Sequence, residues 1–174
     1  MIAKQIEIVQ GDITQLKVDA IVNAANNAFS GGGGVDGAIH RAAGPELLAA
    51  CLQLGRCETG QAKITPGFQL HAKYVIHAVG PVWCGGHKNE ENLLASCYRV
   101  ALNLAETHDV KSIAFPSIST GAYGYPLEQA VKIALESLSI ILERSNQFES
   151  VLIACFDRQT YRAYQRRMKS SYGR

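Results

Sequence analysis

The chain has 174 residues, of which 47% are hydrophobic and 18% are charged. This composition is typical of a globular protein and excludes the disordered class, and the length fits a single domain over residues 1–174. The 17 basic and 15 acidic side chains leave a net charge of +2, which is too balanced to indicate nucleic-acid binding by itself. The 5 cysteines are an odd number and lie far apart. They argue against a disulfide framework and for a reducing compartment.

The amino-terminal segment alternates like a strand and lacks the apolar core of a signal peptide. No apolar run approaches the length of a membrane span. We therefore expect a soluble, cytoplasmic protein that does not associate with membranes, and we expect it to be a monomer.

Short apolar runs alternate with helical patterns along the whole chain. In chain order they predict strands at Ile6–Val9 and Ala20–Asn23, helices at Gly37–Ala43 and Pro45–Leu54, strands at Gln61–Thr65 and Tyr74–Val79, a helix at Asn89–Glu106, a strand at Ile113–Phe115, a helix at Leu127–Glu143, a strand at Val151–Phe156 and a helix that includes Tyr161–Met168. This alternation predicts an α/β layer fold with a mostly parallel sheet. Ligands of such folds bind beyond the carboxyl ends of the strands.

Four consecutive glycines, Gly31 to Gly34, follow the second predicted strand. Ordering four glycines is unfavourable, because glycine loses the most backbone freedom. A compact domain keeps such a run mainly where the backbone approaches something closely. Consecutive amides ahead of a helix form a cradle for an anion. We therefore expect an anionic ligand here, with a mobile surface loop as the alternative.

Three polar side chains near this run have two interpretations each. Asp36 could cap the helix that starts near Gly37, or it could orient and polarise a water molecule. Asn23 and Asn26 could be ordinary turn residues, or their amides could hydrogen-bond to ligand hydroxyls. His40 lies four positions beyond Asp36 on the same helical face; packing is the favoured role for this histidine.

A second loop of small residues, 117–126, lies between a buried strand and a helix. Its hydroxyls, its amides and the helix that follows suit a phosphate. The loop has neither the Gly-Lys-Ser/Thr of a Walker A motif nor the glycines of a nucleophile elbow. Tyr123 lies in a glycine-containing loop, so we expect it to form a wall of the ligand site.

Two further patterns favour ordinary roles. Cys84 and His87 have the spacing of half a metal site without a second pair, so we expect no metal and no cofactor. Arg158, Arg162 and Arg166 recur at helical spacing. They predict a solvated helix face, with an RNA-binding patch as the alternative.

Several of these segments together resemble a known family, in order and over nearly the whole chain. The segments are Gly11-Asp12-Ile13-Thr14, Asn23-Ala24-Ala25-Asn26, the run from Gly31 to Gly44, Thr59-Gly60-Gln61-Ala62, Val75-Ile76-His77-Ala78-Val79-Gly80-Pro81 and the 115–126 loop. The combination is similar to a macrodomain of the MacroD type, and to the bacterial enzymes described as O-acetyl-ADP-ribose deacetylases.

This resemblance implies a single-domain three-layer αβα sandwich with a mixed, mostly parallel central sheet, which binds ADP-ribose at the strand ends. By analogy, Asp12 and the Ile13 amide would bind the adenine, and Phe156 would lie near the adenine or the proximal ribose. Asn23, Asn26 and Asp36 would surround the distal ribose. The residues that would wrap the diphosphate and the distal ribose are Gly33, Gly34, Val35, Ser119, Thr120, Gly121, Ala122 and Tyr123.

The reaction implied by the resemblance is hydrolysis of an ester on the distal ribose. The acyl group would be acetyl, or the acidic side chain of a mono-ADP-ribosylated protein. Asp36 and a ligand phosphate would hold the attacking water while Asn26 positions the ribose. Three alternatives remain open at this stage: a reader that binds ADP-ribose without turnover, an RNA-associated regulatory protein, and a phosphatase acting on a distally phosphorylated ADP-ribose. Protein and RNA partners are left open as well.

Overall fold

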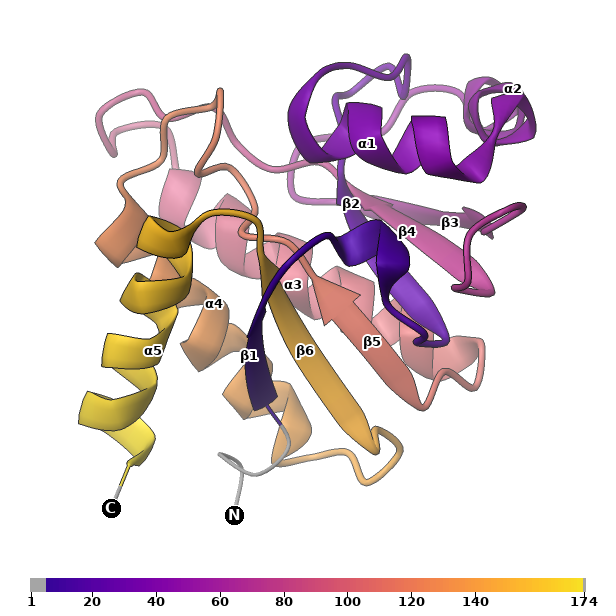
Figure 1. Ribbon diagram of the computed structural model, residues 1–174. Helices are drawn as coiled ribbons and strands as arrows, with labels where there is room; N and C mark the ends of the chain where they lie inside the picture. Colours follow the sequence, from indigo (N-terminus) through magenta and orange to yellow (C-terminus); the bar gives the residue numbers. More distant parts are fainter. Residues whose placement is uncertain (1–5, 174) are drawn as a thin grey trace.

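The computed structural model describes residues 6–173 and has six strands and five α-helices (Figure 1). The strands are β1 (Ile6–Gln10), β2 (Ala20–Ala24), β3 (Ala62–Pro66), β4 (Tyr74–Ala78), β5 (Ser112–Phe115) and β6 (Ser150–Cys155). The helices are α1 (Gly34–Ala43), α2 (Pro45–Leu54), α3 (Glu90–Thr107), α4 (Leu127–Leu142) and α5 (Arg158–Tyr172), and a short 3₁₀ turn, η2 (Ile13–Gln15), follows β1.

The strands form one sheet in the order β1-β6-β5-β2-β4-β3. All neighbours are parallel except β3, which runs antiparallel to β4. Helices α1 and α2 cover one face, and α3, α4 and α5 cover the other (Figure 1). The predicted three-layer αβα sandwich with a mixed, mostly parallel sheet is therefore confirmed.

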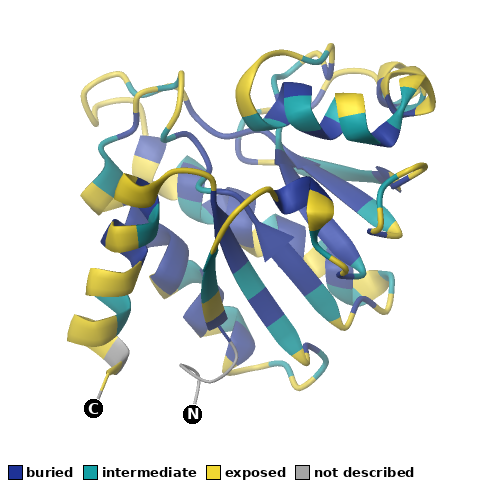
Figure 2. Ribbon diagram, in the orientation of Figure 1, coloured by how far each residue is buried: buried dark blue, intermediate teal, exposed yellow. Residues whose placement is uncertain are grey.

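The core divides between the two faces of the sheet because successive strand residues point in opposite directions. In β2, Val22 joins the apolar cluster under α3, α4 and α5, whereas Ile21 joins the cluster under α1 and α2. The central strands are buried on both faces (Figure 2), as expected of parallel strands covered by helices. The exposed positions gather in the loops and on the outer helix surfaces.

The largest difference from the predicted elements concerns α1. This helix begins at Gly34, three residues before the predicted start at Gly37. The sequence pattern missed the extra turn because Gly34 has a φ of +57°, which a periodicity argument does not recognise as helical. The earlier start moves Asp36 into the first turn. Smaller differences are the unpredicted η2 and the end of α4, which lies at Leu142 rather than at the predicted Glu143.

The parallel arrangement brings the carboxyl ends of β1, β2, β4, β5 and β6 to one edge of the sheet. The loops that leave this edge include residues 25–33 and 116–126, which contain most of the glycine run and the loop of small residues singled out in the sequence, and residues 156–157. Within residues 6–173, none of the helices combines the length and the apolar character that crossing a bilayer would require.

Candidate functional site

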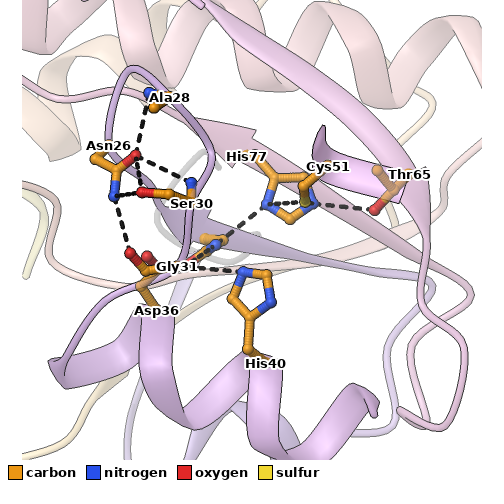
Figure 3. Close-up of polar contacts among 10 residues, drawn as sticks. Asn26, Ala28, Ser30, Gly31, Asp36, His40, Cys51, Thr65 and His77 are labelled. Atoms are coloured by element: carbon orange, nitrogen blue, oxygen red, sulfur yellow. Dashed lines mark hydrogen bonds and ion pairs between the residues drawn. The ribbon is translucent and has the colours of Figure 1, made fainter. Parts of the chain in front are cut away.

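Asp36 lies in the first turn of α1, and its side chain is turned inward (Figure 3). The residue is only 6% exposed. Its Oδ1 accepts a hydrogen bond of 2.8 Å from Asn23 Nδ2 and lies 3.3 Å from His40 Nε2. The N-cap of α1 is Gly33, and no side chain caps the helix. The capping interpretation of Asp36 is therefore wrong, and Asp36 is in contact with His40, which the sequence placed on the same helical face.

The other oxygen of Asp36, Oδ2, is turned toward the glycine run. A Cβ built on Gly32 would lie 3.4 Å from this atom. Among the described residues, no hydrogen-bond donor contacts Oδ2. The carboxylate therefore has one oxygen held by protein groups and one oxygen that remains free to accept.

A chain of buried polar groups continues from Asp36 through the sheet. Asn23 on β2 and His77 on β4 are neighbours in the strand register, and both are 0% exposed. Asn23 Nδ2 lies 3.1 Å from His77 Nδ1, and His77 Nε2 lies 3.0 Å from Thr65 Oγ1 on β3. The Cys51 sulfur on α2 lies 3.5 Å from His77 Nε2 (Figure 3).

This interior changes the ionisation of two groups. Burial, together with the nearby His40, lowers the pKa of His77 to about 3, so the imidazole is neutral near physiological pH. Burial and the Asp36 charge raise the pKa of the Cys51 thiol to about 11. Neither of these two groups carries charge at neutral pH.

Sequence reasoning missed His77, Thr65 and Cys51 as members of this group. A usable signal was present, because His77 interrupts an otherwise apolar strand. The sequence predicts that Asn23 lies beside the ligand. In the structure Asn23 is fully buried and donates to Asp36. The Asn23 Oδ1 atom is buried and has no partner in the part of the chain that the structure describes.

Asn26 organises the loop that precedes α1. Its Nδ2 donates to the Gly31 carbonyl (2.9 Å) and to Ser30 Oγ (3.2 Å), and its Oδ1 accepts from the N–H groups of Ala28 and Ser30 (Figure 3). The loop also packs closely on α1, since a Cβ at Gly37 would lie 2.5 Å from the Gly32 carbonyl oxygen. The glycine run is therefore held against the helix start.

The N-terminus of α1 and the loop after β5 both offer backbone donors. The first three N–H groups of an uncapped helix have no intrahelical acceptor, and residues 32–34 are exposed. In the loop, Ser119 is buried with a φ of +67°, and its carbonyl accepts from the Tyr125 N–H. Within the described chain, the N–H groups of residues 119–123 donate to no protein acceptor. Because β2 and β5 are adjacent, the two donor groups lie at neighbouring strand ends.

Gly80 allows the loop after β5 to approach the strand ends. A Cβ at this position would lie 2.3 Å from Ser119 Oγ and 2.6 Å from the Ile118 side chain. Tyr123 is half-buried, and its carbonyl accepts from the Trp83 N–H. By contrast, Tyr125 is buried in the core. Of the two tyrosines in this loop, Tyr123 is the accessible one.

A third group lies at the ends of β1 and β6, which the Gly11 N–H joins by a bond to the Cys155 carbonyl. Asp12 is exposed, and its Oδ1 accepts from the N–H (2.9 Å) and the hydroxyl (2.7 Å) of Thr14. The backbone of Ile13 follows in η2. Phe156 is 85% exposed, which is unusual for a phenylalanine. An aromatic ring exposed at the strand ends is a suitable surface for a planar base.

The segment with Cys84 and His87 is organised by a carboxylate. Burial opposes ionisation of Glu90, but hydrogen bonds from the backbone N–H groups of Cys84, Gly86 and Lys88 outweigh it and lower its pKa to about 2. Among residues 6–173, no group of three or more His, Cys, Asp or Glu side chains is placed to share a metal ion.

The arginines of α5 are partly paired with α4. Arg166 lies 2.6 Å from Glu128, and Arg167 lies 3.5 Å from Glu136. The same helix face has a shallow hollow lined by Arg162, Gln165, Arg166 and Lys169. The expected solvated face is present; it begins at Arg158, directly after the loop that follows β6, and runs along α5 away from the strand ends (Figure 1).

Comparison with known proteins gives a consistent result. The model of the family described as Macro domain matches residues 22–134. A relative named O-acetyl-ADP-ribose deacetylase, from Salmonella newport, is 56% identical over 93% of this chain and 93% of its own length. The Oceanobacillus iheyensis macrodomain solved with ADP has a TM-score of 0.90 at 47% identity and covers 95% of this chain and 90% of that one. The Trypanosoma brucei macrodomain in complex with ADP-ribose has a TM-score of 0.89 at 44% identity, covering 94% and 69% respectively.

Proposed function

Because the chain belongs to the Macro domain family, we propose that it binds ADP-ribose and hydrolyses esters on the distal ribose. The proposed substrates are O-acetyl-ADP-ribose and proteins with mono-ADP-ribose on acidic side chains. The observation that carries the proposal is the state of Asp36. This buried carboxylate is held by Asn23 through one oxygen and keeps the other free beside the glycine run.

The diphosphate is assigned to the two groups of backbone donors. Gly33, Gly34 and Val35 surround the uncapped start of α1, where the helix dipole favours an anion. The second group is the loop after β5, with Ser119, Thr120, Gly121, Ala122 and Tyr123. Such donors bind phosphate without lysine or arginine, which agrees with the balanced charge of the chain.

The adenosine is assigned to the ends of β1 and β6. Asp12 uses Oδ1 to cap η2 and retains Oδ2 for the adenine amino group, while the Ile13 N–H is a second donor. Phe156 would cover the base or the proximal ribose. Burying its exposed ring against a ligand would supply apolar contact that the free protein lacks.

The distal ribose would lie between the two loops, with Tyr123 as a wall. Asn26 would position this sugar mainly by fixing the loop around Ser30 and Gly31. A water held between Asp36 Oδ2 and a ligand phosphate oxygen would attack the ester carbonyl carbon. The new C–O bond forms to water, the bond to the ribose oxygen breaks, and a proton released by the water passes to the ribose oxygen, which leaves as a hydroxyl. Orientation of this kind lowers a barrier without a strong base.

The proposal includes a monomer that acts in the cytoplasm on soluble substrates. The described cysteines are all free, as suits a reducing compartment. An RNA partner is not included, because two arginines of the α5 face, Arg166 and Arg167, are paired with α4 glutamates.

The test is to incubate the purified protein separately with O-acetyl-ADP-ribose and with a protein mono-ADP-ribosylated on acidic side chains. Mass spectrometry should detect acetate with ADP-ribose from the first substrate, and the unmodified protein with ADP-ribose from the second. Calorimetry with ADP-ribose is run in parallel. Binding without either product would show a reader of ADP-ribose and would refute the hydrolase.

A further inference from the structure

We propose that His77 is a positioning residue for the proposed hydrolysis: its unprotonated Nδ1 fixes the Asn23 amide, which in turn fixes the Asp36 carboxylate. This inference rests on the proposed function. His77 does not reach the ligand, since it is fully buried under α1 and α2. It would act on the reaction only through Asn23.

The sheet itself creates the pair. Asn23 on β2 and His77 on β4 are register partners in parallel strands, so their side chains emerge side by side on the same face. The residues two positions earlier, Ile21 and Val75, are apolar members of the core on that face. Two neighbouring polar groups in an apolar layer are unfavourable unless they bond to each other, and these two lie 3.1 Å apart.

The hydrogen-bond directions follow from the chemistry of the groups. The Asp36 carboxylate can only accept, so the Asn23 atom that faces it at 2.8 Å must be the amide nitrogen. The second amide hydrogen then faces His77 Nδ1, which must carry a lone pair. The ring proton therefore lies on Nε2 and is donated to Thr65 Oγ1 at 3.0 Å.

Each contact in this series removes one rotation. Thr65 fixes the ring of His77 by accepting its Nε2 proton, and the ring fixes the amide plane of Asn23. The amide then holds Asp36 Oδ1 inward, so that Oδ2 is presented toward Gly32. Rotation of the carboxylate would move the accepting oxygen away from the water that the mechanism requires.

Two variants test the two ring nitrogens of His77 separately. An asparagine at position 77 places its side-chain oxygen near the position of Nδ1, whereas a glutamine reaches the position of Nε2. We expect His77→Gln to lower kcat by about 10- to 100-fold, because misplacement of a reacting group by about 1 Å has effects of this size. His77→Asn should recover most of that loss. Both variants should bind ADP-ribose with affinity close to that of the unmodified protein.

The matched control is Cys51→Ala, which removes a contact to the same ring and leaves Nδ1 in place. Its melting temperature should fall while kcat stays within about threefold of the unmodified enzyme, since a lost packing contact acts on stability. A fall in kcat equal to that of His77→Gln would mean that general loosening, not Nδ1, explains the effect, and would overturn the proposal.

The tautomer is tested on the unmodified protein, so the proposal does not depend on whether the variants fold. The ¹⁵N chemical shifts of His77 should show a protonated Nε2 and an unprotonated Nδ1. A protonated Nδ1, or equal turnover by His77→Gln and the unmodified protein, would contradict the positioning role. If the unmodified protein hydrolyses neither substrate, the proposed function itself is wrong and the role of His77 falls with it.

Discussion

Asp12 and Asp36 both lie at the start of a helical segment beside the proposed ligand, yet their carboxylates have different surroundings. Asp12 is exposed, and its Oδ1 is occupied by the N–H and the hydroxyl of Thr14 two residues later. Asp36 is buried, and its Oδ1 is occupied by Asn23, which is distant in sequence. The first is an ordinary cap. The second is held by a strand distant in sequence, and it also contacts His40 one turn later in its own helix.

The difference shows that a position in the first turn of a helix does not determine a role. The two carboxylates differ in the partner of their bonded oxygen. In Asp12 this oxygen accepts from the backbone two residues later, whereas in Asp36 it accepts from a side chain on a separate strand. We therefore expect substitution of Asp36 to act on the chemical step, and substitution of Asp12 to act on stability and on binding.

The largest expected effect is that of Asp36→Asn. This change keeps the shape and the acceptor for Asn23 but removes the negative charge that would polarise the water. We expect deacetylation to fall by about 10²- to 10⁴-fold, the range for a general acid–base group, with ADP-ribose affinity nearly unchanged. Steady-state kinetics and calorimetry on the same preparation measure both. A variant with the normal rate and a lowered melting temperature would show that the carboxylate is structural.

The next effect is that of Asp12→Ala. Loss of a charged hydrogen-bond acceptor for the adenine should weaken ADP-ribose binding by about 1.5–3 kcal/mol. Loss of the cap on η2 should lower stability by about 0.5–2 kcal/mol. Asp12→Asn is the matched control, because asparagine caps as well as aspartate, so only the binding should weaken. Unchanged affinity in both variants would remove Asp12 from the adenine site.

The environment of Asp36 should also appear in the pH dependence of stability. The pKa of His77 is lowered to about 3 by burial and by His40, whereas an unfolded histidine titrates near about 6.5. Between these values the unfolded chain binds the extra proton. The free energy of unfolding should therefore be highest above about pH 6.5 and fall on acidification by up to about 1.4 kcal/mol per pH unit.

Urea denaturation between about pH 7 and about pH 5 measures this slope. In His77→Gln the slope should be shallower, because the titrating group is gone. Equal slopes in the two proteins would mean that His77 is not the group responsible. The surroundings of Asp12 should contribute no such slope, because its hydrogen-bond partner Thr14 does not titrate in this range.

The smallest effect concerns thiol reactivity. Of the five free cysteines only Cys84 is exposed, and burial with the Asp36 charge raises the pKa of Cys51 to about 11. A thiol reagent at neutral pH should therefore label one cysteine per chain rapidly and all of them after unfolding. Cys84→Ser should abolish the rapid phase. A second rapid thiol in the native protein would indicate that the interior beside Asp36 opens.

The sequence was sufficient for the fold but not for the interior of the site. Local patterns predicted the strands to within one residue at their ends, and α2 with its bounds at Pro45 and Leu54, because periodicity, proline and glycine act locally. The start of α1 was missed, since a left-handed Gly34 carries no periodic signal. The Asn23–His77 pair depends on which strands become neighbours, which no local pattern contains.

The hydrogen-bond partners of Asn26 and Asp36 could not be predicted for the same reason. Their residue types and the glycine run marked the correct segment, yet their partners are set by tertiary contacts. Asn26 is occupied by its own loop, and Asp36 is bonded to a different strand. The sequence shows which polar groups are present. Which of their donors and acceptors remain free for a ligand depends on how the chain packs.

The sheet order has a consequence for how the chain folds. Among the strands of residues 6–173, β1 lies at the edge of the sheet and pairs with β6 alone, with Ile6 beside Val151. The first strand can therefore join the sheet only after nearly the whole chain has been synthesised, and closing so long a loop is slow. The η2 turn directly follows β1, so this turn and Asp12 should also reach their final positions late. A chain shortened before Ser150 would lose two strands of the sheet rather than one.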